Sequence, residues 1–179
     1  MKKMIAMLLL AAMCLALFAG CAKSETDPTD AKKLILATSA DYPPFEFHIV
    51  DKDGKDAIVG IDVSVAKKIA QDMGLELEIL DISFDNLVTA MEKGQADIVI
   101  SAMESDEKRD ASVDFSDAYY TDYPPLILVK KENAGSYASL SDFDGKTVGA
   151  QTATTKESAV KELMPGASLL SLASVNDLV

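Results

Sequence analysis

The chain has 179 residues, of which 29 are acidic and 17 basic, and its formal net charge is −12 at pH 7. An acidic surface of this kind repels phosphate backbones, so the composition argues against a nucleic-acid partner. A single histidine and two cysteines leave no material for a histidine-rich metal site, and we expect neither a metal nor a cofactor.

The first 21 residues have the pattern of a targeting segment. Lys2 and Lys3 precede an apolar run from Met4 to Phe18, and Ala19, Gly20 and Cys21 follow. The run is short for a membrane span and is typical of a secretory signal peptide. The sequence therefore predicts a leader over residues 1–21.

Cysteine usage suggests how the leader ends. Cys14 lies inside the apolar run, so Cys21 is the one cysteine left after cleavage, and a lone cysteine in a secreted protein needs a role. LFAGC resembles a bacterial lipobox, with Phe18 where leucine is usual. The resemblance implies lipid attachment (palmitate) at Cys21. Cleavage by an ordinary signal peptidase near Ala19 or Gly20 is the alternative.

Residues 22–33 are polar and lack periodicity, as expected of a flexible tether. Beyond them, strand and helix patterns alternate. Asp62 is the expected N-cap of a helix whose apolar face is Ala66, Ile69, Ala70 and Met73, and Asp53-Gly54 marks a hairpin turn. The expected elements, in order, are a strand at 34–38, a helix at 62–74, a strand at 75–80, a helix from Ser83 to Gly94 and a strand at 97–101.

The second half of the chain continues the alternation. Residues 123–130 begin with a tyrosine and two prolines and continue as an apolar extended run. Thr154 and Glu157 have capping-box spacing before a helix that Pro165 and Gly166 end. Strands are expected at 146–150 and 168–172. Such an order predicts a layered sheet with right-handed crossovers.

Arg109 is the only arginine in the chain. Its planar guanidinium matches a carboxylate in two parallel charge-assisted hydrogen bonds, which a lysine cannot do. It follows the apolar run 98–100, and strand ends in open α/β sheets are where ligands bind. A surface ion pair with Asp106 or Asp110 is the plainer interpretation.

The run from Asp97 to Ser116 resembles the family 3 extracellular solute-binding proteins, the receptors of polar amino acid ABC importers. Residues 60–74 and 84–97 resemble two further motifs of that family. Glu104 and Asp106 depart from the pattern, because the family usually has small hydroxyl residues there. The matching positions of the first motif are Asp97, Ser101, Ala102, Met103, Glu107, Arg109, Asp114, Phe115 and Ser116.

The resemblance implies an α/β fold of the periplasmic-binding-protein type (type II) with two lobes. Lobe 1 would span 34–122 and be nearly complete, 123–130 would be a hinge strand, and 131–179 would be a partial lobe 2, truncated relative to the family. The protein would be a monomeric receptor, anchored by lipid to the outer face of the cell membrane. It would capture a free amino acid or similar zwitterion by lobe closure, deliver it to an ABC permease and catalyse no reaction.

The resemblance also assigns site residues. The ligand α-carboxylate would meet Arg109, the backbone N–H of Glu104 and the helix start at Thr154 and Thr155. The Glu104 carboxylate would either hold the ligand ammonium or repel its carboxylate. Judged by helical periodicity alone, Phe84 is a core residue. In this plainer interpretation, Thr154 serves only as a helix cap, with no contact to a ligand. The full set of ligand-binding candidates is Ser39, Tyr42, Phe84, Ser101, Ala102, Glu104, Arg109, Gln151, Thr154 and Thr155.

Two other functions share this fold. A dehydratase-like enzyme would use Glu104 and Asp106, although their spacing is also that of a solvated turn. A sensory ligand-binding module would need a further domain.

Overall fold

The computed structural model describes residues 32–121 and 123–179, and Lys32–Val179 form one compact unit. The expected leader, Cys21 and all but the last two residues of the expected tether lie outside the described residues. The first strand already begins at Lys33, inside the range expected for the tether.

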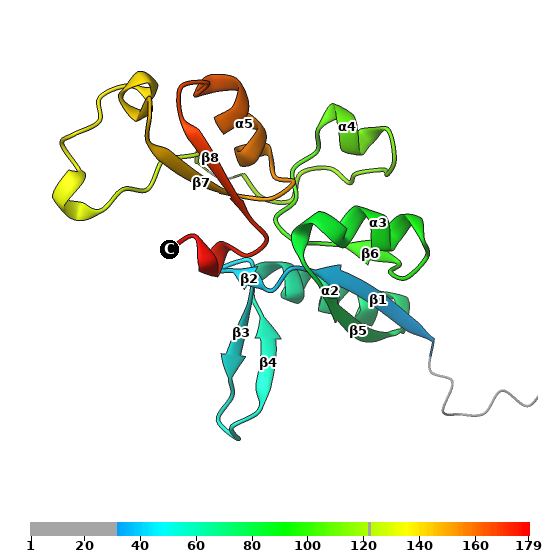
Figure 1. Ribbon diagram of the computed structural model, residues 1–179. Coiled ribbons are helices and arrows are strands. Elements are labelled where there is room, and N and C mark those ends of the chain that lie inside the picture. The colour runs from blue at the N-terminus through cyan, green and yellow to red at the C-terminus, as the bar shows by residue number, and fades with distance from the viewer. Residues whose placement is uncertain (1–31, 122) are drawn as a thin grey trace, which may run out of the picture. The chain divides into compact units, whose positions relative to one another are not determined.

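A three-stranded parallel sheet organises the first part of the chain (Figure 1). Strand β1 (Lys33–Thr38) lies in the middle and pairs with β5 (Glu76–Asp81) on one side and β6 (Ile98–Val99) on the other. Successive residues of β1 point to opposite faces, so a central strand needs apolar residues at nearly every position. The run KLILAT meets that requirement.

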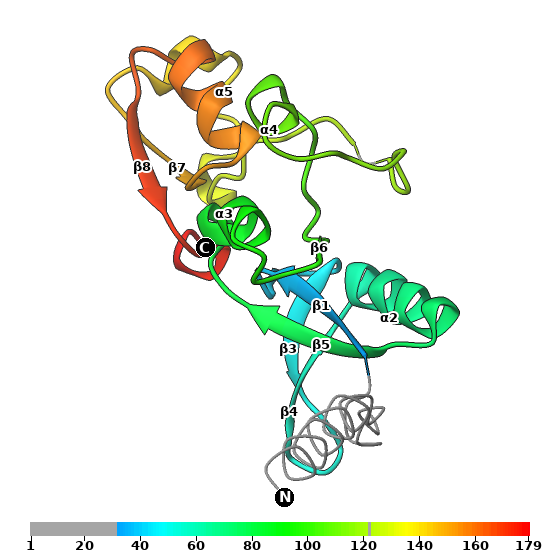
Figure 2. The same cartoon turned by 90° about the vertical axis from the view of Figure 1, so that its right-hand side faces the viewer.

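Helices cover both faces of this sheet. Leu36 packs with Ala66 of α2 (Ile61–Met73) on one face, and Ala37 packs with Leu87 of α3 (Leu87–Glu92) on the other. Figure 2 shows α2 running beside β1 and β5. The alternation predicted from the sequence is therefore confirmed as a layered sheet.

A hairpin completes this part. Strand β3 (Glu46–Val50) pairs antiparallel with β2 (Asp41–Tyr42) and with β4 (Asp56–Val59). The predicted Asp53-Gly54 turn joins β3 to β4, and Gly54 has the positive φ of 76° that such a turn requires.

The start of α2 differs from the prediction. Its N-cap is Gly60, not Asp62, and φ there is 136°. A Cβ atom at Gly60 would lie 2.0 Å from the carbonyl oxygen of Phe45, so only glycine fits. Asp62 is instead fully buried in the first turn, where its carboxylate accepts hydrogen bonds from other segments. Met73, expected in the core, is 59% exposed.

The C-terminal part is smaller. Strand β7 (Thr147–Gln151) pairs in parallel with β8 (Ser168–Leu172), and α5 (Thr155–Leu163) connects them. Phe143, Val148 and Met164 form its core. Short turns of helix complete the described chain: η1 (Phe84–Asn86), α4 (Glu107–Asp110), η2 (Lys131–Asn133), η3 (Leu140–Phe143) and η4 (Val175–Asp177).

The expected hinge strand at 123–130 is not formed. A strand needs a neighbour for its backbone N–H and C=O groups, and this segment pairs with none of the described strands. Leu126 and Leu128 are 90% and 83% exposed. The division of the chain into lobes at this segment stays a prediction.

No helix among residues 32–121 and 123–179 is long and apolar enough to cross a membrane.

Candidate functional site

One pocket of about 690 Å³ gathers most of the candidate residues. Its lining includes residues that follow the C-terminal ends of parallel strands β1, β5, β6 and β7, which is where α/β sheets bind ligands. The segment before β7, β7 and α5 themselves, and the last residues of the chain provide the rest of the lining. The volume is in the usual range for small-molecule sites. Nine of the ten candidates line it: Tyr42, Phe84, Ser101, Ala102, Glu104, Arg109, Gln151, Thr154 and Thr155.

Ser39 is the tenth candidate and is not part of the lining. It is 5% exposed, and its backbone N–H donates to the Ser101 hydroxyl at 3.0 Å. Its own hydroxyl turns to Asp41 at 3.3 Å. Ser39 therefore supports the pocket from behind, and Asp41, which the sequence analysis did not select, lines it.

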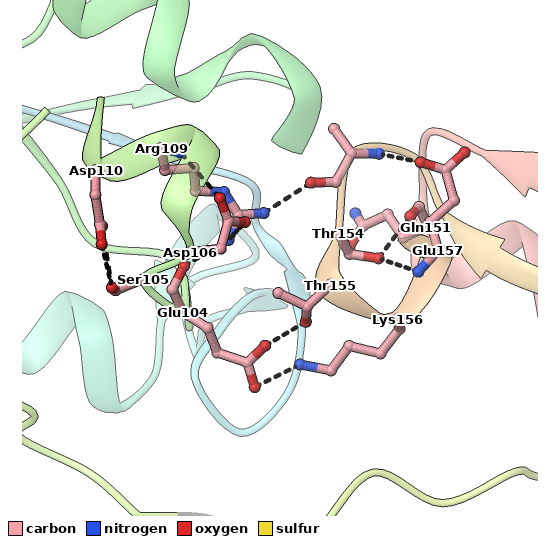
Figure 3. A network of polar contacts seen from close by, with 11 residues as sticks. Glu104, Ser105, Asp106, Arg109, Asp110, Gln151, Thr154, Thr155, Lys156 and Glu157 are labelled. Atoms are coloured by element: carbon pink, nitrogen blue, oxygen red, sulfur yellow. Dashed lines mark hydrogen bonds and ion pairs between the residues drawn. The ribbon is translucent and has the colours of Figure 1, made fainter. Parts of the chain in front are cut away.

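Arg109 is only 8% exposed, which rules out a solvated surface position. Asp106 caps α4 by accepting the Arg109 backbone N–H at 2.9 Å, and this cap fixes the backbone position from which the Arg109 side chain extends. The guanidinium donates to the carbonyl oxygens of Glu104 and, at 2.7 Å, Ala153 (Figure 3). The ion pair with Asp106, at 3.3 Å, exists as well.

Arg109 thus joins two distant stretches of chain. Its contact with Ala153 reaches the loop between β7 and α5, 44 residues away. Ala102 and Ala153 have positive φ values of 45° and 62°, which non-glycine residues rarely adopt. Such backbone strain concentrates at functional sites, and both alanines lie in segments around the pocket.

The Glu104 carboxylate is engaged by side chains at the start of α5, and its expected role toward a ligand stays a prediction. It accepts from the Thr155 hydroxyl and pairs with Lys156 Nζ at 2.8 Å (Figure 3). Partial burial opposes its ionisation, but the hydrogen bonds from Lys156 and Thr155 outweigh that effect and lower the pKa of Glu104. The carboxylate is therefore charged and satisfied within the protein.

The start of α5 has the predicted cap. The Thr154 hydroxyl accepts from the Glu157 backbone N–H at 3.1 Å and donates to the Gln151 carbonyl. In a capping box, the Glu157 carboxylate would accept the backbone N–H of the N-cap, Thr154. Here it accepts the N–H of the preceding residue, Ala153, at 3.0 Å. The Gln151 side chain donates to Ala173 at 3.0 Å. First-turn N–H groups of a helix have no partner within it and favour an anion.

The aromatic candidates have different surroundings. Phe84 packs against the core around Leu87, and the Arg109 guanidinium lies 5.5 Å from its ring centroid, so it serves both core and pocket. Tyr42 is 37% exposed and stacks on Phe45 at 5.7 Å. A flat side chain could lie against these rings.

Two buried acids behind the pocket were missed. Glu46 and Asp62 are 1% and 0% exposed, and Glu46 also reaches the lining. Buried carboxyls are rare without a partner, but in the sequence Glu46 alternates with Phe45 and Phe47 as a solvent-facing strand residue would. Only Asp62 gave a signal, as a supposed cap. In the described part of the chain, no cluster of metal-ligating side chains is present.

The fold, with a pocket at the ends of parallel strands, is that of the type II periplasmic-binding-protein class. Residues 34–167 match the family of bacterial extracellular solute-binding proteins, family 3. This chain belongs to that family, which acts outside the cytoplasm, and the recognition and fold predicted from the sequence are confirmed.

Among curated proteins, the chain is 42% identical over 165 residues to the arginine-binding extracellular protein ArtP of Bacillus subtilis, covering 92% of this chain and 62% of that protein. It is 32% identical over 154 residues to a probable arginine-binding protein, ArtJ, of Chlamydia trachomatis, covering 86% and 57%. The chain thus spans about three fifths of the length of these relatives.

Solved structures agree. The amino acid ABC transporter substrate-binding protein AbpA of Streptococcus pneumoniae, bound to L-arginine, is 41% identical with a TM-score of 0.77, covering 82% of this chain and 61% of that one. The ancestral amino acid-binding protein AncCDT-1, a precursor of cyclohexadienyl dehydratase, is 36% identical with a TM-score of 0.74, covering 82% and 63%.

Proposed function

We propose that this chain is the ligand-binding part of an ABC importer receptor that captures a free α-amino acid. The observation that carries the proposal is the buried guanidinium of Arg109 at the wall of the pocket, next to the start of α5. A ligand carboxylate there would replace the Ala153 carbonyl as the acceptor for Arg109 and would meet the first N–H groups of α5.

L-Arginine and related cationic amino acids are the first candidates for the ligand. The names of the relatives support this choice. The carboxylate of Asp41 in the lining adds negative charge that suits a cationic side chain. The rings of Tyr42 and Phe84 offer faces on which a guanidinium stacks.

We further propose that the receptor is held at the outer face of the membrane by lipid on Cys21, works as a monomer and passes its ligand to a permease. It catalyses no reaction. The likeness to AncCDT-1 makes a dehydratase the rival proposal. Glu104 would be the main catalytic carboxylate of such an enzyme, but it is engaged by Thr155 and Lys156. If incubation with prephenate or arogenate yields no product, the result supports the receptor. Turnover of either compound would instead support the enzyme.

Arg109→Ala in the full-length protein tests the site. We expect at least a 100-fold rise in the Kd for L-arginine by calorimetry, because each hydrogen bond to a charged group contributes about 1.5–3 kcal/mol. Lys108→Ala, an exposed cation one residue earlier, is the matched control and should bind as the wild type does. Circular dichroism should show both variants folded. Unchanged affinity in Arg109→Ala would refute the proposal.

A further inference from the structure

The two buried acids behind the pocket lie on different elements. Glu46 begins β3, and Asp62 is in the first turn of α2. Neither side chain is more than 1% exposed, and the two accept hydrogen bonds from adjacent residues, Glu46 from Ser101 and Asp62 from Ala102. Two ionised carboxylates that bond to neighbouring residues, away from water, would repel strongly.

Each acid holds one residue of the ligand-binding segment. The Ser101 hydroxyl donates to Glu46 Oε1 at 3.0 Å and in turn accepts the Ser39 backbone N–H at 3.0 Å. The Ala102 backbone N–H donates to Asp62 Oδ2 at 2.6 Å. These bonds fix the segment after β6 in the conformation that gives Ala102 its positive φ.

Among the described residues, no lysine or arginine forms an ion pair with Glu46 or Asp62. The groups that act on Glu46 are Asp62 on α2, Ser101 after β6 and Asp41 on β2. Tyr119 donates its hydroxyl to Asp62 Oδ1 at 2.9 Å, and burial together with that carboxylate raises the pKa of Tyr119 and keeps it neutral. Glu46 Oε2 is buried and accepts no hydrogen bond from the described residues.

We propose that Glu46 and Asp62 share one proton and that this carboxyl pair positions Ser101 and Ala102 for ligand binding. The proton turns the repulsion between the acids into a hydrogen bond and leaves the pair with one negative charge. That charge accepts the bonds from Ala102 and Tyr119. The positioning role rests on the proposed function of the pocket; the shared proton does not.

Titration gives the proposal its signature. Burial, and then the charge of Asp62, raise the pKa of Glu46 to about 9 from about 4.5. At intermediate pH the folded protein therefore holds a proton that the unfolded chain has released. The stability that this group contributes is complete below about pH 4.5 and is lost as the pH rises toward about 9.

The first experiment compares the unfolding of the full-length wild type and Glu46→Gln by urea between pH 5.5 and 8.5. A glutamine can donate to Asp62 and accept from Ser101 without a proton of its own. The unfolding equilibrium constant of the wild type should rise about tenfold per pH unit relative to that of Glu46→Gln. His48, held by Asp81 and Asp56, adds a dependence of the same sign, but it is common to both proteins and cancels.

Glu92→Gln is the control, because Glu92 is exposed on α3; it should follow the wild type at every pH. Infrared spectra at pH 7 should show a protonated carboxyl band in the wild type that Glu46→Gln lacks. The shared proton would be refuted if Glu46→Gln kept the pH dependence of the wild type, or if the two proteins showed the same carboxyl bands.

The second experiment tests positioning, with L-arginine as the probe. Glu46→Gln should bind within about threefold of the wild type, whereas Glu46→Met, which has no acceptor for Ser101, should bind at least tenfold more weakly. Equal affinity in both variants would refute the positioning role. If neither the wild type nor either variant binds an amino acid, the proposed function fails. The pH comparison still tests whether Glu46 and Asp62 share a proton. Glu46→Gln provides that decision even if Glu46→Met does not fold.

Discussion

The N-terminal region, residues 33–121, and the C-terminal region, residues 131–179, use the same units of strand and helix but differ in how they are buried. In the first, the middle strand β1 has a neighbour on each side and helices on both faces. In the second, two strands and one helix share a core of three buried residues. Leu163 of α5 and Leu170 of β8 are 57% and 45% exposed.

The comparison teaches where the binding site obtains its rigidity. The segments after β1 and β6 are held by buried groups, including Glu46 and Asp62. The loop before α5 is held by Glu157 and by the contact of Arg109 with Ala153. The pocket therefore has one wall backed by a well-buried core and one wall backed by a smaller core.

The largest effect should come from matched deletions in the two cores. Leu36→Ala and Met164→Ala each remove a long buried side chain, for which the general cost is about 2–5 kcal/mol of unfolding free energy. We expect Leu36→Ala near the upper end, because its site is enclosed on all sides. Met164→Ala should lie near the lower end, because the smaller core relaxes.

Hydrogen exchange separates the two outcomes by region. Leu36→Ala should reduce amide protection throughout the protein, and Met164→Ala only within 131–179. Equal loss of protection in both regions after Met164→Ala would show that the two cores unfold as one, and the comparison would be wrong.

The next effect concerns Glu157, the acid that ties the loop before α5. It is 9% exposed and accepts from Ser171 Oγ at 2.6 Å and from Lys161 at 3.0 Å, besides Ala153. Glu157→Gln should cost about 1.5–3 kcal/mol at pH 7, the usual range for hydrogen bonds to a charged group. Glu162→Gln, exposed on the same helix, should cost less than about 0.5 kcal/mol.

The pH dependence of this effect has a definite sign. The hydrogen bond from Ser171 leads the interactions that lower the pKa of Glu157 below 4.5. Its contribution is therefore complete above about pH 4.5 and is lost as the pH falls through the lowered value. Urea unfolding from pH 7 to pH 3 should show the wild type approaching Glu157→Gln; a constant gap would contradict it.

Local patterns predicted much of the fold. The strand 168–172 agrees with the structure, the Thr154 cap is present, and Gly74 ends α2 with a φ of 68°. These features depend on neighbours in sequence, which a sequence displays directly. The strand predicted at 123–130 is not formed, because a strand depends on a pairing partner that a local pattern does not reveal.

The candidate site was predicted unevenly for the same reason. Arg109 was visible as a unique residue type in a family motif, and the pocket contains it. The contacts of Arg109 with Ala153, of Glu46 with Ser101 and of Asp62 with Ala102 join residues that no local pattern links. Glu104 shows the limit most clearly, since its partners Thr155 and Lys156 lie about 50 residues further on.

The smallest effect belongs to that last contact. The side chains of Glu104 and Lys156 are 53% and 44% exposed, and ion pairs of such exposure contribute about 0–1 kcal/mol. A double-mutant cycle of Glu104→Gln and Lys156→Met, read by urea unfolding, should give a coupling of that size that shrinks at high salt. Glu107→Gln, an exposed acid nearby, should show no coupling to Lys156→Met.

A coupling above about 2 kcal/mol would mean that the exposed pair, and not Arg109, is the main bond between the two walls. We expect the reverse, because water solvates Glu104 and Lys156 equally well when they separate. Ligand affinity should accordingly change less than tenfold in Glu104→Gln. The strong contact of the wall backed by the smaller core would then be the one made by the buried guanidinium, whose donors a ligand carboxylate can take over.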